Sequence, residues 1–215
     1  MKHSLKADLQ SLFPVWLGGV LLPLPALAFW RAGIGRSMAL VLFSIGCASI
    51  VAYAFRRDFL PRSVEAAESP EQTWRRRMQS AGLALFSASA VFSVISLTLN
   101  DSQDFVEAWL AFMLPLPALG VVPFFMVVTR KPLAAVVFGI FTVFSMKLLG
   151  CIVVVLVYGW HASEHVPPYT DMPWTHPNLL VWLFWLNTAV LSLSLYVLGR
   201  KKFMRNKTVL AKAAR

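Results

Sequence analysis

The sequence predicts an all-α, polytopic membrane protein with six transmembrane helices and both termini in the cytoplasm. Of its 215 residues, 58% are hydrophobic and only 14% are charged, whereas a soluble domain carries about 25% charge. Six apolar stretches have roughly the 20 residues that a helix needs to cross a bilayer. They leave no room for a separate soluble domain, so residues 1–215 form a single transmembrane domain. The spans lie near residues 12–30, 38–55, 80–99, 108–128, 133–158 and 179–198.

The distribution of basic residues predicts the orientation of these spans. With the N-terminus in the cytoplasm, all but three of the 20 lysines and arginines fall in cytoplasmic segments. The exceptions are Arg31 and Arg36, which lie outside, and Lys147, which lies within a span. This asymmetry follows the positive-inside rule. We therefore attribute the net charge of +10 to topology and to anionic membrane lipids, not to nucleic acid, and expect a multi-pass protein of the cell (inner) membrane.

The first residues of the chain precede the first span and have an amphipathic pattern. Leu5, Leu9 and Leu12 are spaced i, i+4 and i+7, so they share one face of a helix. We expect a short amphipathic N-terminal helix on the cytoplasmic membrane surface. The alternative is a frayed N-terminal tail.

Prolines interrupt the first and the fourth span. The stretch "LPLPAL" occurs at residues 22–27 and again at 114–119. Proline removes a backbone donor, and an exposed break in a helix is not tolerated in lipid. We therefore expect both breaks to face protein or a water-filled path. The repetition indicates either an inverted repeat of three spans per half or a coincidence in a leucine-rich sequence.

Residues 56–79 form the most charged segment and are predicted to be the first cytoplasmic loop. Within it, Ser69–Gln72 reads as a helix N-cap, a proline at the first helical position, an acid and a glutamine at the third. This capping box predicts that the third helix begins at Pro70. It would then run for about 30 residues, or about 45 Å. We expect Arg75–Arg77 to lie among the lipid headgroups.

Two polar residues fall inside predicted spans. Lys147 in the fifth span and Asn187 in the sixth lie at similar depths. Polar groups at such depth are costly and often mark a substrate path. The alternatives are that carbonyls freed by the prolines satisfy Lys147, or that the span is shifted in register.

The long outer loop at residues 159–178 carries three histidines. His161 and His165 are spaced i, i+4, and His176 is available as a third ligand, which is a weak indication of a zinc or copper site. The alternative interpretation is an ordinary polar loop at the membrane surface.

The layout of the chain resembles the permease subunits of ABC-2-type transporters. The resemblance rests on Asp58-Phe59, Ser63, Pro70, Trp74 and the basic turn Arg75–Arg77, in that order after the second span. It also rests on the opening stretch "LKADLQSLFPVWL", which is similar to the family's entry into its first span.

The resemblance implies a transporter subunit that is not itself an enzyme. In that family the first cytoplasmic loop docks on a separate cytoplasmic ATP-binding subunit, so ATP is bound by the partner and this chain holds no cofactor. The chain has no Walker A sequence of its own. A homodimer or a paired permease is expected. The coupling residues implied by the resemblance are Asp58, Ser63, Glu65, Glu68, Glu71 and Trp74.

Two other hypotheses remain open. One is a membrane-bound metal-site protein or enzyme that uses the outer histidines His161, His165 and His176. The other is a non-catalytic membrane scaffold or immunity protein.

Overall fold

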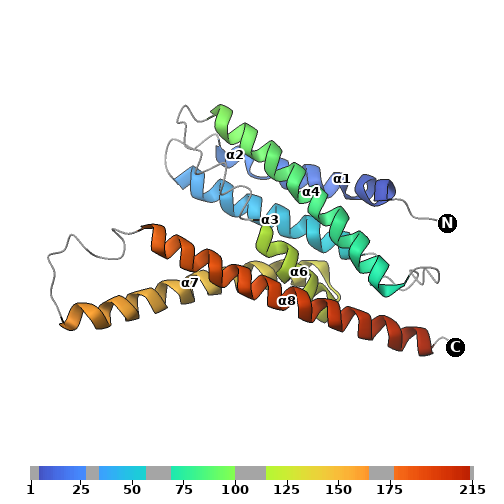
Figure 1. Ribbon diagram of the computed structural model, residues 1–215. Helices are drawn as coiled ribbons and strands as arrows, with labels where there is room; N and C mark the ends of the chain where they lie inside the picture. The colour runs from blue at the N-terminus through green and yellow to red at the C-terminus, as the bar shows by residue number, and fades with distance from the viewer. Residues whose placement is uncertain (1–4, 28–33, 57–68, 100–114, 165–176, 214–215) are drawn as a thin grey trace.

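The computed structural model describes residues 5–27, 34–56, 69–99, 115–164 and 177–213, and every element in these ranges is a helix. The predicted all-helical class is therefore confirmed (Figure 1). Three helical segments, at 5–26, 38–56 and 70–98, are long and apolar enough to cross a membrane, which indicates a membrane protein. The helices are α1 (Leu5–Leu21), α2 (Leu24–Leu27), α3 (Ile34–Arg56), α4 (Pro70–Leu99), α6 (Leu116–Thr129), α7 (Pro132–Glu164) and α8 (Pro177–Ala213).

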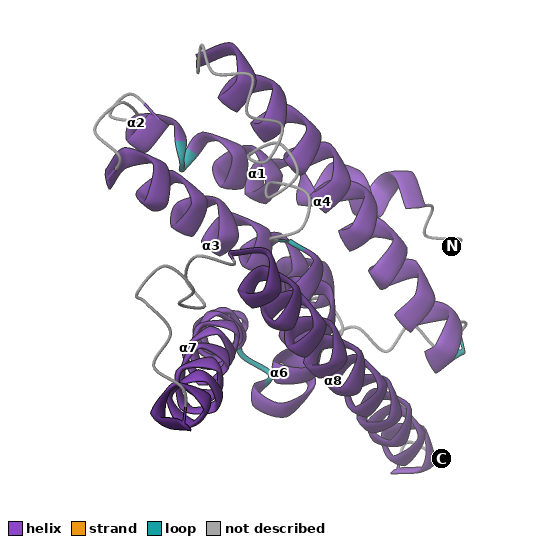
Figure 2. Ribbon diagram, turned by 60° about the vertical axis from the view of Figure 1, so that its left-hand side comes forward, coloured by secondary structure: helices purple, strands orange, loops and turns teal. Residues whose placement is uncertain are grey.

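The long helices form two groups of three. Helices α1, α3 and α4 pack against one another, and so do α6, α7 and α8. The groups meet where α3 packs on α6 and α7 and where α4 packs on α8 (Figures 1 and 2). Helix α3 contacts both groups, and its Phe43, Ile50, Val51 and Phe55 are buried. The core of the molecule therefore lies along α3.

Glycines allow the closest helix crossings within each group. A Cβ atom on Gly46 of α3 would lie 2.7 Å from the Cα of Gly19 in α1. A Cβ atom on Gly120 of α6 would overlap the backbone of Ser192 in α8, and the Ser192 hydroxyl donates a 3.3 Å hydrogen bond to the Pro117 carbonyl. Small residues at such crossings are typical of membrane helices, because they let the two backbones approach.

The separate surface helix expected at the N-terminus is not present. Helix α1 runs without a break from Leu5 through Pro14 to Leu21. Its buried positions include Asp8 and Leu12, whereas Leu5 and Leu9 are only partly buried. The expectation was wrong because α1 packs against α3 and α4. This packing buries Leu12 of the leucine stripe together with Asp8, which lies four residues before it on the same face.

The prolines of the repeated stretch act differently in its two copies. In the first copy, the chain leaves α1 after Leu21 and re-enters a short helix at Leu24. In the second, Pro115 is the N-cap residue of α6. As expected, most of these prolines face protein: Pro23, Pro115 and Pro117 are buried, whereas Pro25 is exposed. Pro123, further along α6, is also buried.

The last two helices extend beyond the apolar stretches that predicted them. The fifth stretch was expected to end at residue 158, and α7 continues to Glu164. The sixth was expected to end at residue 198, and α8 continues to Ala213. Hydropathy locates apolar segments, but a helix continues into water as long as its backbone hydrogen bonds are maintained. The predicted spans 108–128 and 133–158 leave only a short connection between them, and the structure has a tight turn there, with Arg130 in the left-handed conformation at φ 57°.

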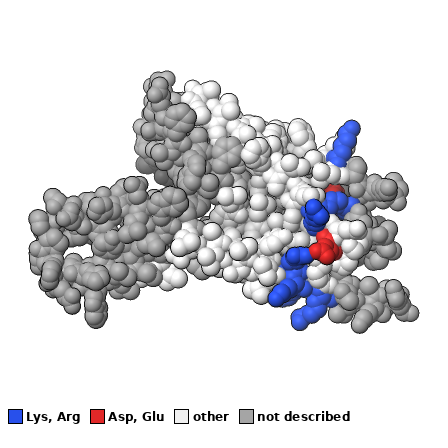
Figure 3. Space-filling view, viewed as in Figure 1, with Lys and Arg blue, Asp and Glu red and all other residues white. Residues whose placement is uncertain are grey.

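Basic side chains gather at one end of the bundle, where α1 begins and α8 ends (Figures 1 and 3). We call this the basic end. It includes the last residue of α3, the second turn of α4, the turn between α6 and α7, and the last part of α8. Its exposed members are Lys6, Arg56, Arg75, Arg130, Lys131, Arg200, Lys201 and Arg205.

Candidate functional site

The first turn of α4 has the capping box that the sequence predicts. The Ser69 hydroxyl accepts a 3.2 Å hydrogen bond from the Gln72 backbone N–H, and the Gln72 side-chain oxygen accepts one of 3.3 Å from the Ser69 N–H. Two backbone donors that the helix itself leaves unpaired are thereby satisfied. The helix begins at Pro70 and has 30 residues, so the charged segment enters α4 at a fixed point at the basic end.

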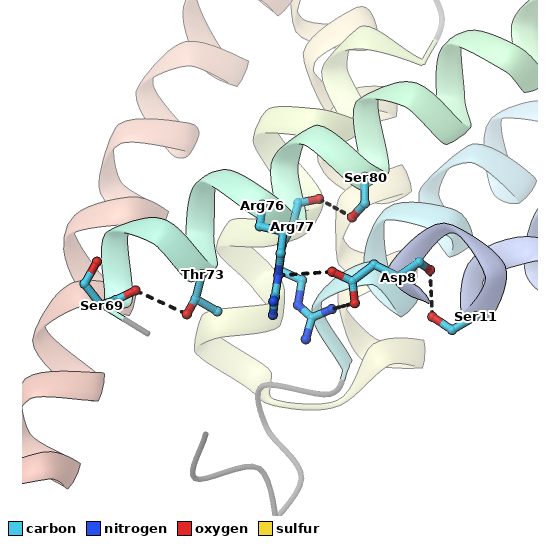
Figure 4. Close-up of polar contacts among 7 residues, drawn as sticks. All are labelled: Asp8, Ser11, Ser69, Thr73, Arg76, Arg77 and Ser80. Atoms are coloured by element: carbon cyan, nitrogen blue, oxygen red, sulfur yellow. Dashed lines mark hydrogen bonds and ion pairs between the residues drawn. The ribbon is translucent and has the colours of Figure 1, made fainter. Parts of the chain in front are cut away.

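A buried ionic cluster joins α1 to the second turn of α4. The Asp8 carboxylate accepts a 2.7 Å hydrogen bond from the Arg77 guanidinium, and the Arg76 Nε lies 3.1 Å from the other carboxylate oxygen (Figure 4). The Asp8 and Arg77 side chains are only 2% and 5% exposed. Charges removed from water this far depend on each other, because loss of one removes an ion-pair partner from a charge that stays buried. We call Asp8, Arg76 and Arg77 the ionic cluster.

The expectation that Arg75–Arg77 all lie among the headgroups was therefore wrong for Arg77. Successive helical residues are rotated by about 100°, so three consecutive arginines cannot share one face. Arg75 is exposed, Arg76 is partly buried and Arg77 is buried against Asp8. The run divides between the surface and the interior.

Trp74 is the centre of an aromatic cluster that connects three helices. Its ring lies 5.0 Å from that of Phe55 in α3, and 5.9 Å and 5.2 Å from those of Tyr196 and Phe203 in α8. Trp74 is 2% exposed, so it is not a surface contact for a soluble partner. Aromatic pairs at these distances add to the stabilisation from burial. The cluster joins α3 and α4 of the first group to α8 of the second.

Glu71 makes a second link between α4 and α8. Its carboxylate forms an ion pair with the Arg200 guanidinium. Both side chains are well exposed, so the pair is accessible to water and contributes little stability. Glu71 remains on the surface at the start of α4, where a docking partner would find it.

The other residues implied by the resemblance lie outside the part of the chain that the structure describes. These are Asp58, Ser63, Glu65 and Glu68. They come shortly before Ser69, so the capped start of α4 fixes one end of the segment that carries them.

The two polar residues expected inside the membrane lie on different helices. Lys147 is part of α7, and only its backbone is described. Asn187 is part of α8 and its side chain is exposed on the outside of the bundle. Asn187 therefore does not line an interior path through this chain.

The histidines of the predicted metal site are not brought together within the described ranges. His161 lies in α7, where only its backbone is described, and His165 and His176 lie outside those ranges. The part of the chain that the structure describes contains no group of three or more residues placed to hold a metal ion. The metal site stays an untested prediction.

Sequence reasoning missed Asp8 and the α8 residues that contact α4. A signal for Asp8 was present, because it is the only acid in the first ten residues, and an acid entering a membrane helix needs a cationic partner. No sequence signal pairs Trp74 with Tyr196 and Phe203, because aromatic residues also occur singly at membrane interfaces.

No family model matches the chain, and no curated protein or solved structure matches it. The function is therefore inferred from the residues themselves.

Proposed function

We propose that this chain is the membrane-spanning permease subunit of an ABC-2-type transporter. It resides in the cell (inner) membrane with six spans, and both termini and the basic end lie in the cytoplasm. A separate cytoplasmic subunit binds and hydrolyses ATP and docks on residues 56–79. The chain itself contributes no catalytic residue and no cofactor.

The observation that carries this proposal is the anchoring of the start of α4. The ionic cluster joins α4 to α1, and the Trp74 cluster joins it to α3 and α8. A packed interior transmits displacement because it compresses little. A force on the segment before Ser69 would therefore reach both three-helix groups, as a subunit driven from the cytoplasm requires.

The charges near this point also support docking. Glu65, Glu68 and Glu71 are acids in a region whose other charged residues are mostly basic. Acids within a basic surface give a partner both attraction and orientation, since charge complementarity sets register. Because Trp74 is buried, we infer that it anchors α4 within the bundle. The contact with the ATP-binding subunit would then be made by Asp58, Ser63 and the three glutamates.

Co-purification in mild detergent tests the proposal. The wild-type chain is expected to recover a stoichiometric ATP-binding subunit, identified by mass spectrometry. Glu65→Lys combined with Glu68→Lys is expected to abolish this recovery. The matched control is Asp101→Lys combined with Asp104→Lys. These residues lie between the third and fourth predicted spans, on the side opposite residues 56–79, so the reversal should leave recovery unchanged.

Two results would contradict the proposal. One is recovery of the chain alone from membranes in which other complexes remain intact. The other is equal recovery of the ATP-binding subunit with both pairs of charge reversals, which would remove residues 56–79 from the contact.

A further inference from the structure

The outward face of α8 carries an unpartnered amide at a depth where lipid contact is expected. Asn187 is exposed and lies among exposed apolar residues such as Leu186 and Val190, which are 62% and 58% exposed. It precedes Arg200 by thirteen positions, or about 20 Å along the helix. That distance from the basic end falls within a hydrocarbon core of roughly 30 Å. The amide makes no hydrogen bond to any residue that the structure describes.

The exposed residues around Asn187 follow a heptad pattern. Asn187 and Ser194 are seven residues apart, and so are Val190 and Val197. The spacing of three and four residues between them is that of the a and d positions of two helices packed at a small angle. All four are exposed. We call them the α8 seam.

The opposite face of α8 is already occupied within the chain. Thr188 is 2% exposed, and Gly199 approaches the backbone of Phe124 in α6. Helix α8 also packs against α7 and α4. The seam is therefore a second, separate face that no part of the described chain covers.

The exposed face of α7 provides a contrast. It presents Phe138, Phe141 and Phe144, all at least half exposed. Its Thr142 hydroxyl donates a hydrogen bond to the Phe138 carbonyl of the same helix, as the Ser194 hydroxyl does to the Val190 carbonyl in α8. Lipid satisfies such a face, whereas it offers nothing to the Asn187 amide.

We propose that the α8 seam packs against the α8 seam of a second copy of this chain, with the two Asn187 side chains hydrogen-bonded to each other. An amide both donates and accepts, so two related by a two-fold axis satisfy one another in both directions. A second copy in the same membrane places its Asn187 at the same depth and orientation. A single polar residue at an a position also fixes register and the number of helices.

This inference deepens the proposed function by assigning a surface to the paired permease, and it rests on that function only for the expectation that two copies act together. The pairing of copies and the docking of an ATP-binding subunit have separate measurements. Monomers that still recover the ATP-binding subunit would overturn the inference alone. Dimers that recover none would contradict the proposed function alone.

Disulfide cross-linking in native membranes tests the seam directly. In a full-length chain with Cys47→Ala and Cys151→Ala, single substitutions Val190→Cys and Ser194→Cys are expected to give a cross-linked dimer on mild oxidation. The matched controls are Phe141→Cys and Phe144→Cys on the exposed face of α7, which should give no cross-linked product. Cross-linking at α7 that equals cross-linking at α8 would overturn the proposal.

Dimer affinity in liposomes tests the amide pair. Asn187→Leu is expected to raise the dissociation constant by about threefold to twentyfold, the range for hydrogen bonds between membrane helices. Asn187→Gln, which keeps an amide, should recover part of this loss. Ser194→Ala should change it little, because its hydroxyl is bonded within its own helix. The same dissociation constant for Asn187→Leu as for wild type, or monomers by subunit counting, would overturn the proposal.

Discussion

The Asp8 carboxylate and the Arg77 guanidinium are hydrogen-bonded at 2.7 Å although 69 positions separate them in the chain. Their pairing holds the beginning of α1 against the second turn of α4, inside the bundle at the basic end. The same turn of α4 carries Trp74, which contacts α3 and α8. The start of α4 is therefore the point where the charged segment that precedes Ser69 meets the packed helices.

Removal of the Asp8 carboxylate is expected to destabilise the protein strongly. Asp8→Leu takes their common acid away from the partly buried Arg76 and the buried Arg77, at a cost of about 3–5 kcal/mol. Adding Arg77→Leu removes the buried charge that has lost this partner and should recover part of the loss. Chemical denaturation in detergent measures both. Equal stability of Asp8→Leu and wild type would show that the ionic cluster does not hold α1 to α4.

Truncation of Trp74 is expected to loosen the contact between the two helix groups. Trp74→Ala opens a cavity between α3, α4 and α8 and should cost about 3–5 kcal/mol. Trp74→Phe should cost less, since the indole N–H makes no hydrogen bond in the described structure and the ring contacts are largely kept. Denaturant midpoints compare the two. A loss with Trp74→Phe as large as with Trp74→Ala would contradict the packing explanation.

Alanine at Gly46 is expected to force α1 and α3 apart. Its Cβ would lie 2.7 Å from the Gly19 Cα and 2.8 Å from the Gly19 carbonyl oxygen, and overpacking of this kind costs about 1–3 kcal/mol. Gly18→Ala is the matched control, because its Cβ meets nothing within 4 Å. The control should be neutral or should stabilise by up to about 1 kcal/mol through helix propensity. Thermal unfolding in detergent distinguishes them, and similar shifts would contradict the close crossing.

Loss of the α4 cap is expected to fray the first turn of the helix. Ser69→Ala removes the hydroxyl that accepts from the Gln72 N–H and should cost about 1 kcal/mol. Amide hydrogen exchange should accelerate at Gln72 and Thr73 and not in the middle of α4. The control Gln79→Ala changes an exposed residue of the same helix. Protection that is unchanged in Ser69→Ala would mean that tertiary packing, and not the cap, fixes the start of α4.

The sequence predicted elements that depend on local chemistry. The start of α4 could be predicted because Ser69 and Gln72 satisfy each other's backbone N–H groups and Pro70 needs no partner at the first helical position. The turn between α6 and α7 could be predicted because Thr129–Pro132 separates two apolar stretches. The continuation of α7 and α8 into polar sequence could not be predicted in this way. Hydropathy marks the apolar residues that can cross a membrane, but it does not show where the helix ends.

Side-chain orientation was the part that sequence could not supply. The leucine stripe of residues 5–12 favoured a surface helix, whereas the structure buries Asp8 in the same segment. The burial of an acid there depends on arginines some 70 positions away. The Asn187 amide was expected on an interior path, but α8 turns it outward because its other face packs on α6. Such rotations are set by tertiary packing and not by the pattern within one helix.

A photo-cross-linker placed at position 68 in the intact cell tests the docking of an ATP-binding subunit most directly. We expect one major cross-linked product, a cytoplasmic subunit with an ATP-binding cassette. A cross-linker at position 104, between the third and fourth predicted spans, should give no such product. Cross-links at position 68 to lipid alone, or to a protein without ATPase activity, would contradict the proposal that an ATP-binding subunit docks on residues 56–79.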